Sequence, residues 1–183
     1  MRVVAGELRG RRIEAPPGDD IRPTTDKVRE ATFNALGSLD VVRDALVVDL
    51  FAGTGALGIE ALSRGAAHCT FVERDRKALH YLRDNIATLG LDERAKVVPG
   101  DALVMGGRVE ADLVLADPPY GFDDWARLLS VVTAPFVVAE SGRELPPVDG
   151  WIIRRSKRYG RSWVAFYERD DGLGIDPDAD ERQ

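Results

Sequence analysis

Cysteine is scarce in this chain, because only Cys69 occurs among its 183 residues. A single cysteine excludes an internal disulfide framework and a cysteine-based metal cluster. The two histidines, His68 and His80, have no further metal ligand at a useful spacing, so we expect no metal. No apolar run approaches the ~18 residues of a membrane span, and the apolar start at residues 1–4 is too short for a signal peptide. These absences predict a cytoplasmic, metal-free protein without a membrane anchor.

Charge is distributed unevenly along the chain. The formal net charge is −6, and residues 168–183, where seven acids face two arginines, contribute −5 of it. The remainder is near neutral, with basic clusters at Arg2, Arg9, Arg11 and Arg12 and at Arg154, Arg155, Lys157, Arg158 and Arg161. Charge clusters often mark only a solvated surface, but two of them on a near-neutral body favour a phosphate-binding surface. The acidic stretch is too polar to form a core, so we expect it to be disordered.

Residues 46–58 combine a buried strand with a glycine-rich turn. Leu46 to Phe51 are apolar except for Asp49, and glycines follow at positions 53, 55 and 58 before a helical pattern begins. A strand, a tight turn and a helix form the front half of a nucleotide-binding βαβ unit. The glycine spacing also fits the dinucleotide fingerprint, with Glu73 twenty residues after Gly53, where a ribose-binding acid belongs. The motif alone therefore leaves the identity of the nucleotide open.

The alternation of strands and helices continues after this turn. Apolar strands are predicted at residues 68–73, 95–98, 111–116 and 136–140, with one helix ending near Gly90 and another over 125–132. Two last strands, 151–154 and 162–167, follow each other too closely for a crossover and must be antiparallel. The chain therefore predicts an α/β fold, a Rossmann-like doubly wound seven-stranded sheet of five parallel strands and a C-terminal antiparallel pair.

The N-terminal part adds a hairpin and a helix. Residues 2–15 predict either a short hairpin that displays arginines or a strand tied to the main sheet. A helix should begin at Thr24 or Thr25, and its Phe33 lies off the apolar stripe, so we expect a ligand-facing or partly exposed side chain. We divide the chain into an N-terminal hairpin extension (1–20), a main domain (21–167) and an acidic tail (168–183).

Acidic residues recur where the predicted strands end. Asp49, Glu73, Asp101 and Asp117 all fall at such positions. In a doubly wound sheet, ligands bind outside the carboxyl ends of the strands, near the point where the strand order reverses. Each acid alone could be a helix N-cap, and for Asp101 this alternative is as strong as a ligand role. Together with the glycine turn, the four acids predict a binding site at one edge of the sheet.

Residues 117–120 form a second motif, Asp117-Pro118-Pro119-Tyr120. The prolines stiffen the turn, so the carboxylate of Asp117 and the carbonyl of Pro118 can present two acceptors to an exocyclic amine. Two accepted N–H bonds would aim the lone pair of the nitrogen at an electrophile, and Tyr120 offers a face on which a flipped base can stack. The alternative is a plain Pro-Pro turn with a buried tyrosine. The motif suits methyl transfer to an amine and has no role in hydride transfer.

Both motifs together resemble those of class I S-adenosylmethionine-dependent methyltransferases that act on base amines. The flanking segments, Val4-Ala-Gly6, Leu8-Arg-Gly-Arg11, Arg22-Pro-Thr-Thr-Asp26-Lys-Val-Arg29-Glu with Phe33-Asn34, and Tyr159-Gly, resemble the RsmD family of 16S ribosomal RNA guanine-N2 methyltransferases. The resemblance extends from about Val3 to Tyr167, and the Arg-Pro-Thr-Thr segment does most to narrow it to this family.

The resemblance implies a role for each matching residue. The cofactor S-adenosylmethionine would be bound by Asp49, Phe51, Gly53, Gly55, Glu73, Arg74, Asp101, Ala102 and Asp117, with Arg22, Thr24 and Arg29 at the mouth of the site. Catalysis would involve Asp117, Pro118 and Tyr120. Contacts to RNA would come from Arg9, Arg11, Arg12, Arg29, Pro119 and Arg158. The implied partner is 16S ribosomal RNA, within the small subunit or its assembly intermediate, and the implied enzyme is a monomer.

Three alternatives stay open on the sequence. The same chemistry could act on adenine N6 in DNA. The glycine motif could serve a nicotinamide-dependent oxidoreductase. The fold could also belong to a non-catalytic RNA-binding assembly factor. In the leading hypothesis the methyl group moves by direct displacement, mainly through positioning of the two reactants.

Overall fold

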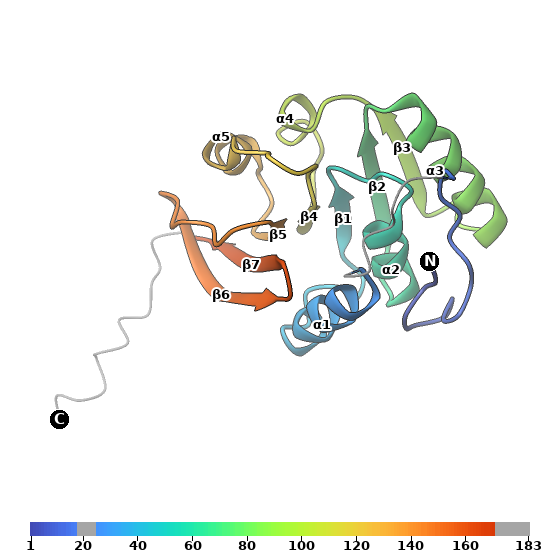
Figure 1. The fold of residues 1–183 in the computed structure, drawn as a ribbon, viewed down its shortest axis with the longest axis horizontal. Coiled ribbons are helices and arrows are strands. Elements are labelled where there is room, and N and C mark those ends of the chain that lie inside the picture. Colours follow the sequence, from blue (N-terminus) through green and yellow to red (C-terminus); the bar gives the residue numbers. More distant parts are fainter. Residues whose placement is uncertain (18–24, 171–183) are drawn as a thin grey trace, which may run out of the picture.

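The computed structural model describes residues 1–17 and 25–170 of the chain. Its centre is a seven-stranded sheet in the order β3-β2-β1-β4-β5-β7-β6 (Figure 1). The strands are β1 (Leu46–Asp49), β2 (His68–Glu73), β3 (Ala95–Pro99), β4 (Leu113–Ala116), β5 (Phe136–Ser141), β6 (Trp151–Tyr159) and β7 (Ser162–Arg169). The helices are α1 (Thr25–Ser38), α2 (Ala56–Ser63), α3 (Arg76–Leu89), α4 (Ala102–Met105) and α5 (Trp125–Val131).

The pairing of the strands confirms the predicted topology. β1 pairs in parallel with β2 and with β4, β2 with β3, and β4 with β5. β7 pairs antiparallel with both β5 and β6. The strand order therefore reverses between β1 and β4, which is where a doubly wound sheet binds its ligand.

Each strand sends alternate side chains into two separate cores. In β1, Val47 packs with α1, α2 and α3, whereas Val48 packs on the opposite face with α4 and α5. Leu115 of β4 belongs to the first core and Val114 to the second. Because both faces are covered, the central strands are mostly apolar on both faces, with Asp49 and Thr70 as buried polar exceptions. Within the described residues, no helix is both long and apolar enough to cross a membrane.

The N-terminal segment is fastened to the helices of the first core. Its ends meet at a single antiparallel bridge between Arg2 and Arg12, so it forms a hairpin-like turn and not a regular two-stranded hairpin. Val3 and Ile13 are buried in the first core. The carboxylate of Glu60, itself 0% exposed, accepts the N–H groups of Val4 and Ala5 at 2.8 and 3.0 Å. The segment is thus part of the packed main body, and the proposed boundary at residue 20 stays a prediction, because residues 18–24 lie outside the described part.

Four expectations from the sequence are wrong in detail. Phe33 is fully buried in the first core and faces no ligand. β6 continues to Tyr159, so most residues of the expected basic turn lie in a strand. β7 continues to Arg169, so the acidic tail cannot begin at residue 168; residues 171–183 lie outside the described part. The short helix α4 was not expected, because four residues show no helical period.

Candidate functional site

The turns after β1 and β4 meet at the carboxyl edge of the sheet, where two cavities adjoin. The first, of about 510 Å³, is lined by Leu50, Phe51, Gly53, Val72, Glu73, Arg74, Asp75, Gly100, Asp101, Ala102, Leu103, Asp117, Pro119 and Phe122. The second, of about 320 Å³, is lined by residues 117–123 and by Trp125, Glu140, Ser141, Gly142, Arg143 and Ser162. Asp117, Pro119 and Phe122 line both cavities. The two turns therefore meet at one edge of the sheet, where the sequence predicted a binding site.

The glycine turn presents its backbone to the first cavity. Gly53 has a φ of +54°, and a Cβ placed there would have no atom within 4 Å, so this position opens onto free space. Its N–H donates to Oε2 of Glu73 at 2.8 Å. Gly55 has a φ of +94°, a conformation that residues with side chains rarely adopt. The turn therefore uses glycine for its backbone shape and leaves one side bare toward the cavity.

The third glycine of the motif serves packing. A Cβ on Gly58 would lie 2.3 Å from a ring carbon of Phe71 and 2.6 Å from Sγ of Cys69, so α2 can approach β2 this closely only with glycine here. The N–H of Gly58 also donates to Oδ2 of Asp49 at 2.9 Å. The turn is thus locked onto the end of β1.

Asp49 is buried beneath the glycine turn. Its side chain is 1% exposed, and Oδ1 has no hydrogen-bond partner. Burial, together with the nearby charge of Glu73, raises the pKa of Asp49 to about 7, although the Gly58 and Phe51 amides act in the opposite direction. Burial, with the nearby charge of Asp49, also raises the pKa of the Cys69 thiol well above its usual range. A buried carboxylate oxygen beneath the turn that borders the first cavity suits a cationic ligand group.

Four acids, Glu73, Asp75, Asp101 and Asp117, line the first cavity together with Arg74. Oε1 of Glu73 accepts the N–H groups of Arg74 and Asp75, both at 2.7 Å, so this carboxylate is rigidly held. Asp101 accepts the N–H of Leu103 at 2.9 Å, which confirms that it caps α4, and its Oδ2 pairs with Arg74 at 3.1 Å. The cap and the cavity lining are compatible roles, because a carboxylate has about four acceptor positions.

The motif at 117–120 forms the wall between the cavities. Asp117 is half-buried and Pro118 buried, whereas Tyr120 is 73% exposed at the second cavity. The alternative of a buried tyrosine is therefore wrong. Phe122 contacts Phe51 edge to face, with ring centroids 5.3 Å apart, and also contacts Trp125 at 5.1 Å. This aromatic row stiffens the turn on the side away from Tyr120.

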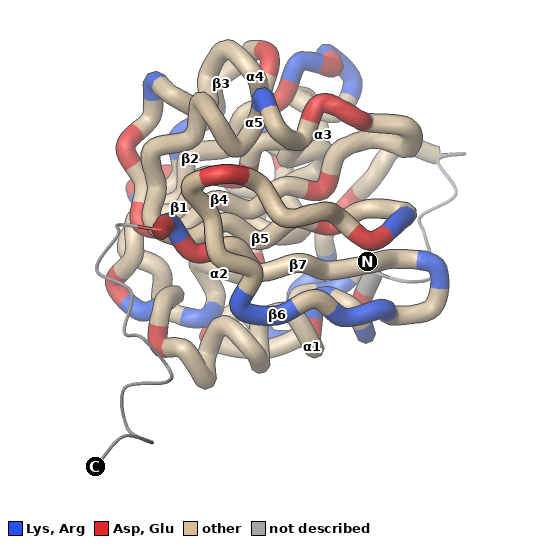
Figure 2. Tube along the Cα trace, turned by 90° about the vertical axis from the view of Figure 1, so that its left-hand side faces the viewer, with Lys and Arg blue, Asp and Glu red and all other residues tan. Residues whose placement is uncertain are grey.

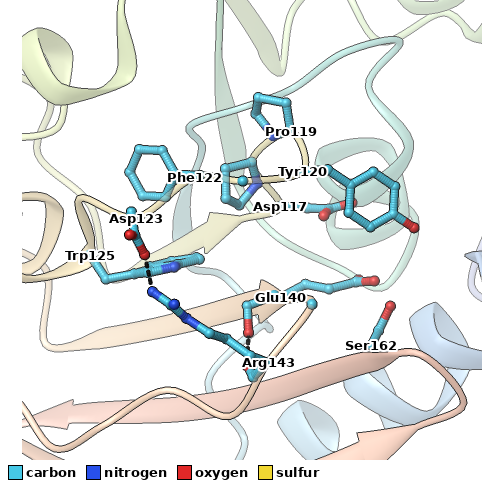
Figure 3. A pocket seen from close by; sticks show the side chains of 13 residues that line it. Asp117, Pro119, Tyr120, Phe122, Asp123, Trp125, Glu140, Arg143 and Ser162 are labelled. Atoms are coloured by element: carbon cyan, nitrogen blue, oxygen red, sulfur yellow. Dashed lines mark hydrogen bonds and ion pairs between the residues drawn. The ribbon is translucent and has the colours of Figure 1, made fainter.

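The second cavity takes its other wall from β5, β7 and the loop after β5 (Figure 3). Glu140 comes from β5 and Ser162 from the start of β7. Arg143 forms an ion pair with Asp123 at the other end of the cavity. Asp117, Tyr120, Glu140 and Ser162 thus surround one space at the carboxyl edge of the sheet.

The two predicted basic clusters lie at different parts of the molecule. Arg9, Arg11 and Arg12 are exposed on the N-terminal segment, where Arg11 donates to the carbonyl of Thr88 in α3. The second cluster follows β6, the edge strand at the other end of the sheet (Figure 2). Arg158 is exposed there, next to the turn that leads to Ser162. Arg22 and Thr24 lie outside the described residues.

Arg29 does not lie on a surface that RNA could contact. Its side chain is 2% exposed, and it pairs with Asp26 at 2.8 Å and with the buried Glu60 at 3.4 Å. It also donates to the carbonyl of Arg2 at 2.5 Å. The expectation of an RNA contact or a position at the mouth of the site is wrong in this structure, because the guanidinium instead holds the N-terminal segment against α1 and α2.

Comparison with known proteins identifies the family of the chain. The family model described as "Conserved hypothetical protein 95" matches residues 1–168. The chain belongs to this family. "Putative rRNA methyltransferase YlbH" of Bacillus subtilis (strain 168) is 40% identical over 185 residues, which cover 92% of this chain and 99% of that protein. "Ribosomal RNA small subunit methyltransferase D" of Escherichia coli (strain K12) is 36% identical over 182 residues, which cover 93% of this chain and 90% of the other.

A solved structure agrees with this membership. The one titled "Putative methyltransferase yhhF from Escherichia coli" has a TM-score of 0.80 and 37% identity, and the match covers 92% of this chain and 97% of the other. The resemblance to the RsmD family inferred from the sequence is thereby confirmed.

Sequence reasoning missed several residues that line the site of this family member. Phe122 borders both cavities, and Glu140 and Ser162 line the second. For Glu140 a signal was present, since it stands at the carboxyl end of a predicted strand, as do the four acids that were singled out. Ser162 carried no such signal, because its place depends on how β7 pairs with β5.

Proposed function

We propose that this chain transfers a methyl group from S-adenosylmethionine to the exocyclic N2 amine of a guanine in 16S ribosomal RNA. The observation that carries the proposal is the shared wall of the two cavities, Asp117, Pro119 and Phe122. Such a wall allows a cofactor on one side to meet a base on the other. Relatives named as ribosomal RNA methyltransferases, with coverage of nine tenths or more of both chains, support the same substrate class.

The first cavity fits S-adenosylmethionine better than a dinucleotide. Four carboxylates, Glu73, Asp75, Asp101 and Asp117, line it, and Asp49 lies beneath its glycine turn. Such a charge suits a ligand with an ammonium, a sulfonium and a ribose diol, whereas it repels a pyrophosphate. The Gly53 N–H, which would bind a pyrophosphate in a dinucleotide site, is already donated to Glu73. The volume of about 510 Å³ is in the range of small-ligand sites.

Each predicted cofactor residue then has a task. Glu73 accepts hydrogen bonds from the ribose hydroxyls with its remaining acceptor positions. Asp101 and Ala102 hold the adenine, and Arg74 braces Asp101 through its ion pair. Phe51 and the bare backbone of Gly53 and Gly55 border the rest of the ligand. When bound, the cofactor supplies an electrophilic methyl group.

The second cavity holds the target base. The carboxylate of Asp117 and the carbonyl of Pro118 accept the two hydrogens of the amine, which directs its lone pair toward the first cavity. The base stacks on Tyr120, and Pro119 borders it. The product amine loses one proton, which passes to Asp117 or to water. The acceleration comes mainly from placing the two reactants in line, since positioned reactants can gain several orders of magnitude in rate.

The basic edge formed by β6 is the surface best placed for the RNA backbone. Arg155, Lys157, Arg158 and Arg161 are all exposed along this hairpin, and Ser162 of the second cavity follows Arg161 directly. Phosphates that flank the extruded base would therefore meet guanidinium groups. The proposal also includes contacts of Arg9, Arg11 and Arg12 with the RNA, and an enzyme that acts as a monomer.

The test offers labelled cofactor with three acceptors: small-subunit particles isolated without the modification, naked 16S ribosomal RNA, and duplex DNA. We expect label in the ribosomal material and none in DNA. The matched variant Asp117→Ala should retain the fold and lose transfer. Label in DNA would favour the adenine-N6 alternative, and unimpaired particle binding without transfer by the wild type would favour a non-catalytic assembly factor. Calorimetric binding of a nicotinamide dinucleotide, with none of S-adenosylmethionine, would overturn the proposal.

A further inference from the structure

Three polar side chains from three neighbouring strands of the sheet line the second cavity in a row. Asp117 follows β4, Glu140 lies in β5 and Ser162 begins β7. β4 and β5 pair in parallel with Ala116 opposite Ala139, so Asp117 and Glu140 occupy the next positions along the two strands. β7 lies on the other side of β5. Neighbouring strands are ~4.8 Å apart, so the sheet itself spaces a carboxylate, a second carboxylate and a hydroxyl across its carboxyl edge.

The side chain of Glu140 is directed along this cavity. Figure 3 shows it extending from β5 toward the side where Asp117, Tyr120 and Ser162 lie. Glu140 is half-buried, and Ser162 is only 6% exposed. A base stacked on Tyr120 would therefore place its edge along the row.

The hydrogen-bonding edge of guanine carries groups in a matching order. Its N2 amine and its N1–H are donors, and O6 is an acceptor. Resting on the proposed function, in which Asp117 binds the N2 amine, we propose that Glu140 accepts the N1–H of the target base and is the residue that selects guanine. The Ser162 hydroxyl then faces O6 as a donor. The carboxylate also draws the N1 proton toward itself, which leaves more electron density on the N2 amine.

The same row rejects adenine. Adenine has an unprotonated N1, which is an acceptor, and a carboxylate beside it meets lone pair with lone pair. A site built around a hydrogen bond discriminates strongly against a ligand that lacks the donor, because the buried acceptor is then left unpaired. Asp117 alone cannot discriminate in this way, since adenine and guanine both carry an exocyclic amine.

The experiment compares two particles that differ in a single base. After the modified guanine has been mapped, small-subunit particles are assembled with guanine or with 2-aminopurine at that position. 2-Aminopurine keeps the N2 amine but has an unprotonated N1 and carries hydrogen in place of O6. It therefore removes the Ser162 contact as well, equally in every variant that keeps Ser162, so the change of the ratio in the Glu140 variant reports on N1. For the wild type we expect kcat/KM to fall by at least about 10- to 100-fold with 2-aminopurine, the range for a hydrogen bond to a charged group. In Glu140→Gln, whose amide can donate to N1, the ratio of the two kcat/KM values should shrink by about 10-fold or more.

Two controls separate a specificity role from a structural one. Glu144→Gln removes an exposed charge from the same segment and should leave the ratio as in the wild type. The affinity of Glu140→Gln for S-adenosylmethionine, measured by calorimetry, should be unchanged. An equal loss of activity on both particles, with the ratio retained, would overturn the role of Glu140 while leaving the proposed function intact. Wild-type enzyme that methylates neither particle would overturn the proposed function and this inference with it.

Discussion

The N–H of Gly53 donates to Oε2 of Glu73 at 2.8 Å, which ties the glycine turn after β1 to the acid that ends β2. The two residues are twenty positions apart, a spacing that also fits dinucleotide-binding proteins. In this protein the carboxylate of Glu73 already accepts the N–H of Gly53, so this N–H is not available to a ligand. The bond therefore both shapes the first cavity and disfavours a phosphate in it.

Glu73→Gln tests this arrangement. The amide keeps the shape of the side chain but removes its charge, so both the Gly53 bond and the ribose contact weaken. We expect the Kd for S-adenosylmethionine to rise about 10- to 100-fold, the range for hydrogen bonds to charged groups. Calorimetry measures the change, and Glu93→Gln, at an exposed position before β3, is the matched control. Unchanged affinity would remove Glu73 from the cofactor site.

Tyr120→Ala tests stacking of the base. Tyr120 is 73% exposed, so its removal should change the free energy of unfolding by less than ~0.5 kcal/mol. Loss of stacking costs about 1–3 kcal/mol per base, which predicts a rise in KM for the particle of about 5- to 150-fold. Steady-state kinetics check this, with Tyr120→Phe expected to retain most of the affinity. Tyr81→Ala on α3, which lines neither cavity, should leave KM unchanged.

Asp49→Asn tests the buried carboxylate. Burial raises the pKa of Asp49 from 3.8 to about 7. Between these values the folded state holds a proton that the unfolded chain has released, so the group makes the protein less stable as pH rises, up to about pH 7. Asparagine lacks this dependence. In the absence of cofactor, the difference in the free energy of unfolding between the variant and the wild type should move in favour of the variant by up to about 4 kcal/mol from pH 4 to pH 8. Urea unfolding at both pH values measures the gain, and an equal difference at both would contradict the raised pKa.

Arg29→Ala and Arg158→Ala should differ in their effect on the stability of the protein. Arg29 is buried and pairs with Glu60, so its removal leaves a buried carboxylate with one cation fewer and should lower the free energy of unfolding by about 3 kcal/mol. Arg158 is exposed, and its removal should change stability by less than ~0.5 kcal/mol. Chemical denaturation of both variants decides this. Comparable stability of the two would mean that Arg29 does not anchor the N-terminal segment.

The double variant Arg158→Ala/Arg161→Ala tests the basic edge formed by β6. If both side chains contact phosphates, the double variant binds the small-subunit particle more weakly. The negative slope of log K against log salt then becomes shallower by about 1–2. Binding curves at several salt concentrations give the slope. Arg9→Ala/Arg12→Ala, on the N-terminal segment, serves as the comparison. A slope that changes only in the second pair would move the RNA surface to the other end of the sheet.

The fold could be predicted from the sequence because local patterns specify it. The strands β1, β2, β4 and β5 are mostly apolar without alternation, which is typical of strands covered on both faces. The short spacing between β6 and β7 left only an antiparallel pair. Their full lengths were missed because the outer half of β6 is exposed and charged, with no apolar period to detect.

The site was predictable only where its residues sit in motifs. The glycine turn and residues 117–120 were recognised because their spacing is specific. The second cavity was not, since Glu140 and Ser162 meet Asp117 only through long-range pairing of β4, β5 and β7. Burial of Arg29 was also beyond a sequence argument, because its partner Glu60 lies on another helix and no periodic pattern links the two.

The identity of the product tests the central claim most directly. Small-subunit particles lacking the modification are treated with the protein and S-adenosylmethionine, and the RNA is digested to nucleosides for mass spectrometry. The proposal predicts about one N2-methylguanosine per particle with the wild type and none with Asp117→Ala. Methylation at a different atom would contradict the claim that the two cavities bring a methyl donor to a guanine amine. RNA that stays unmethylated although the protein binds the cofactor tightly would contradict it as well.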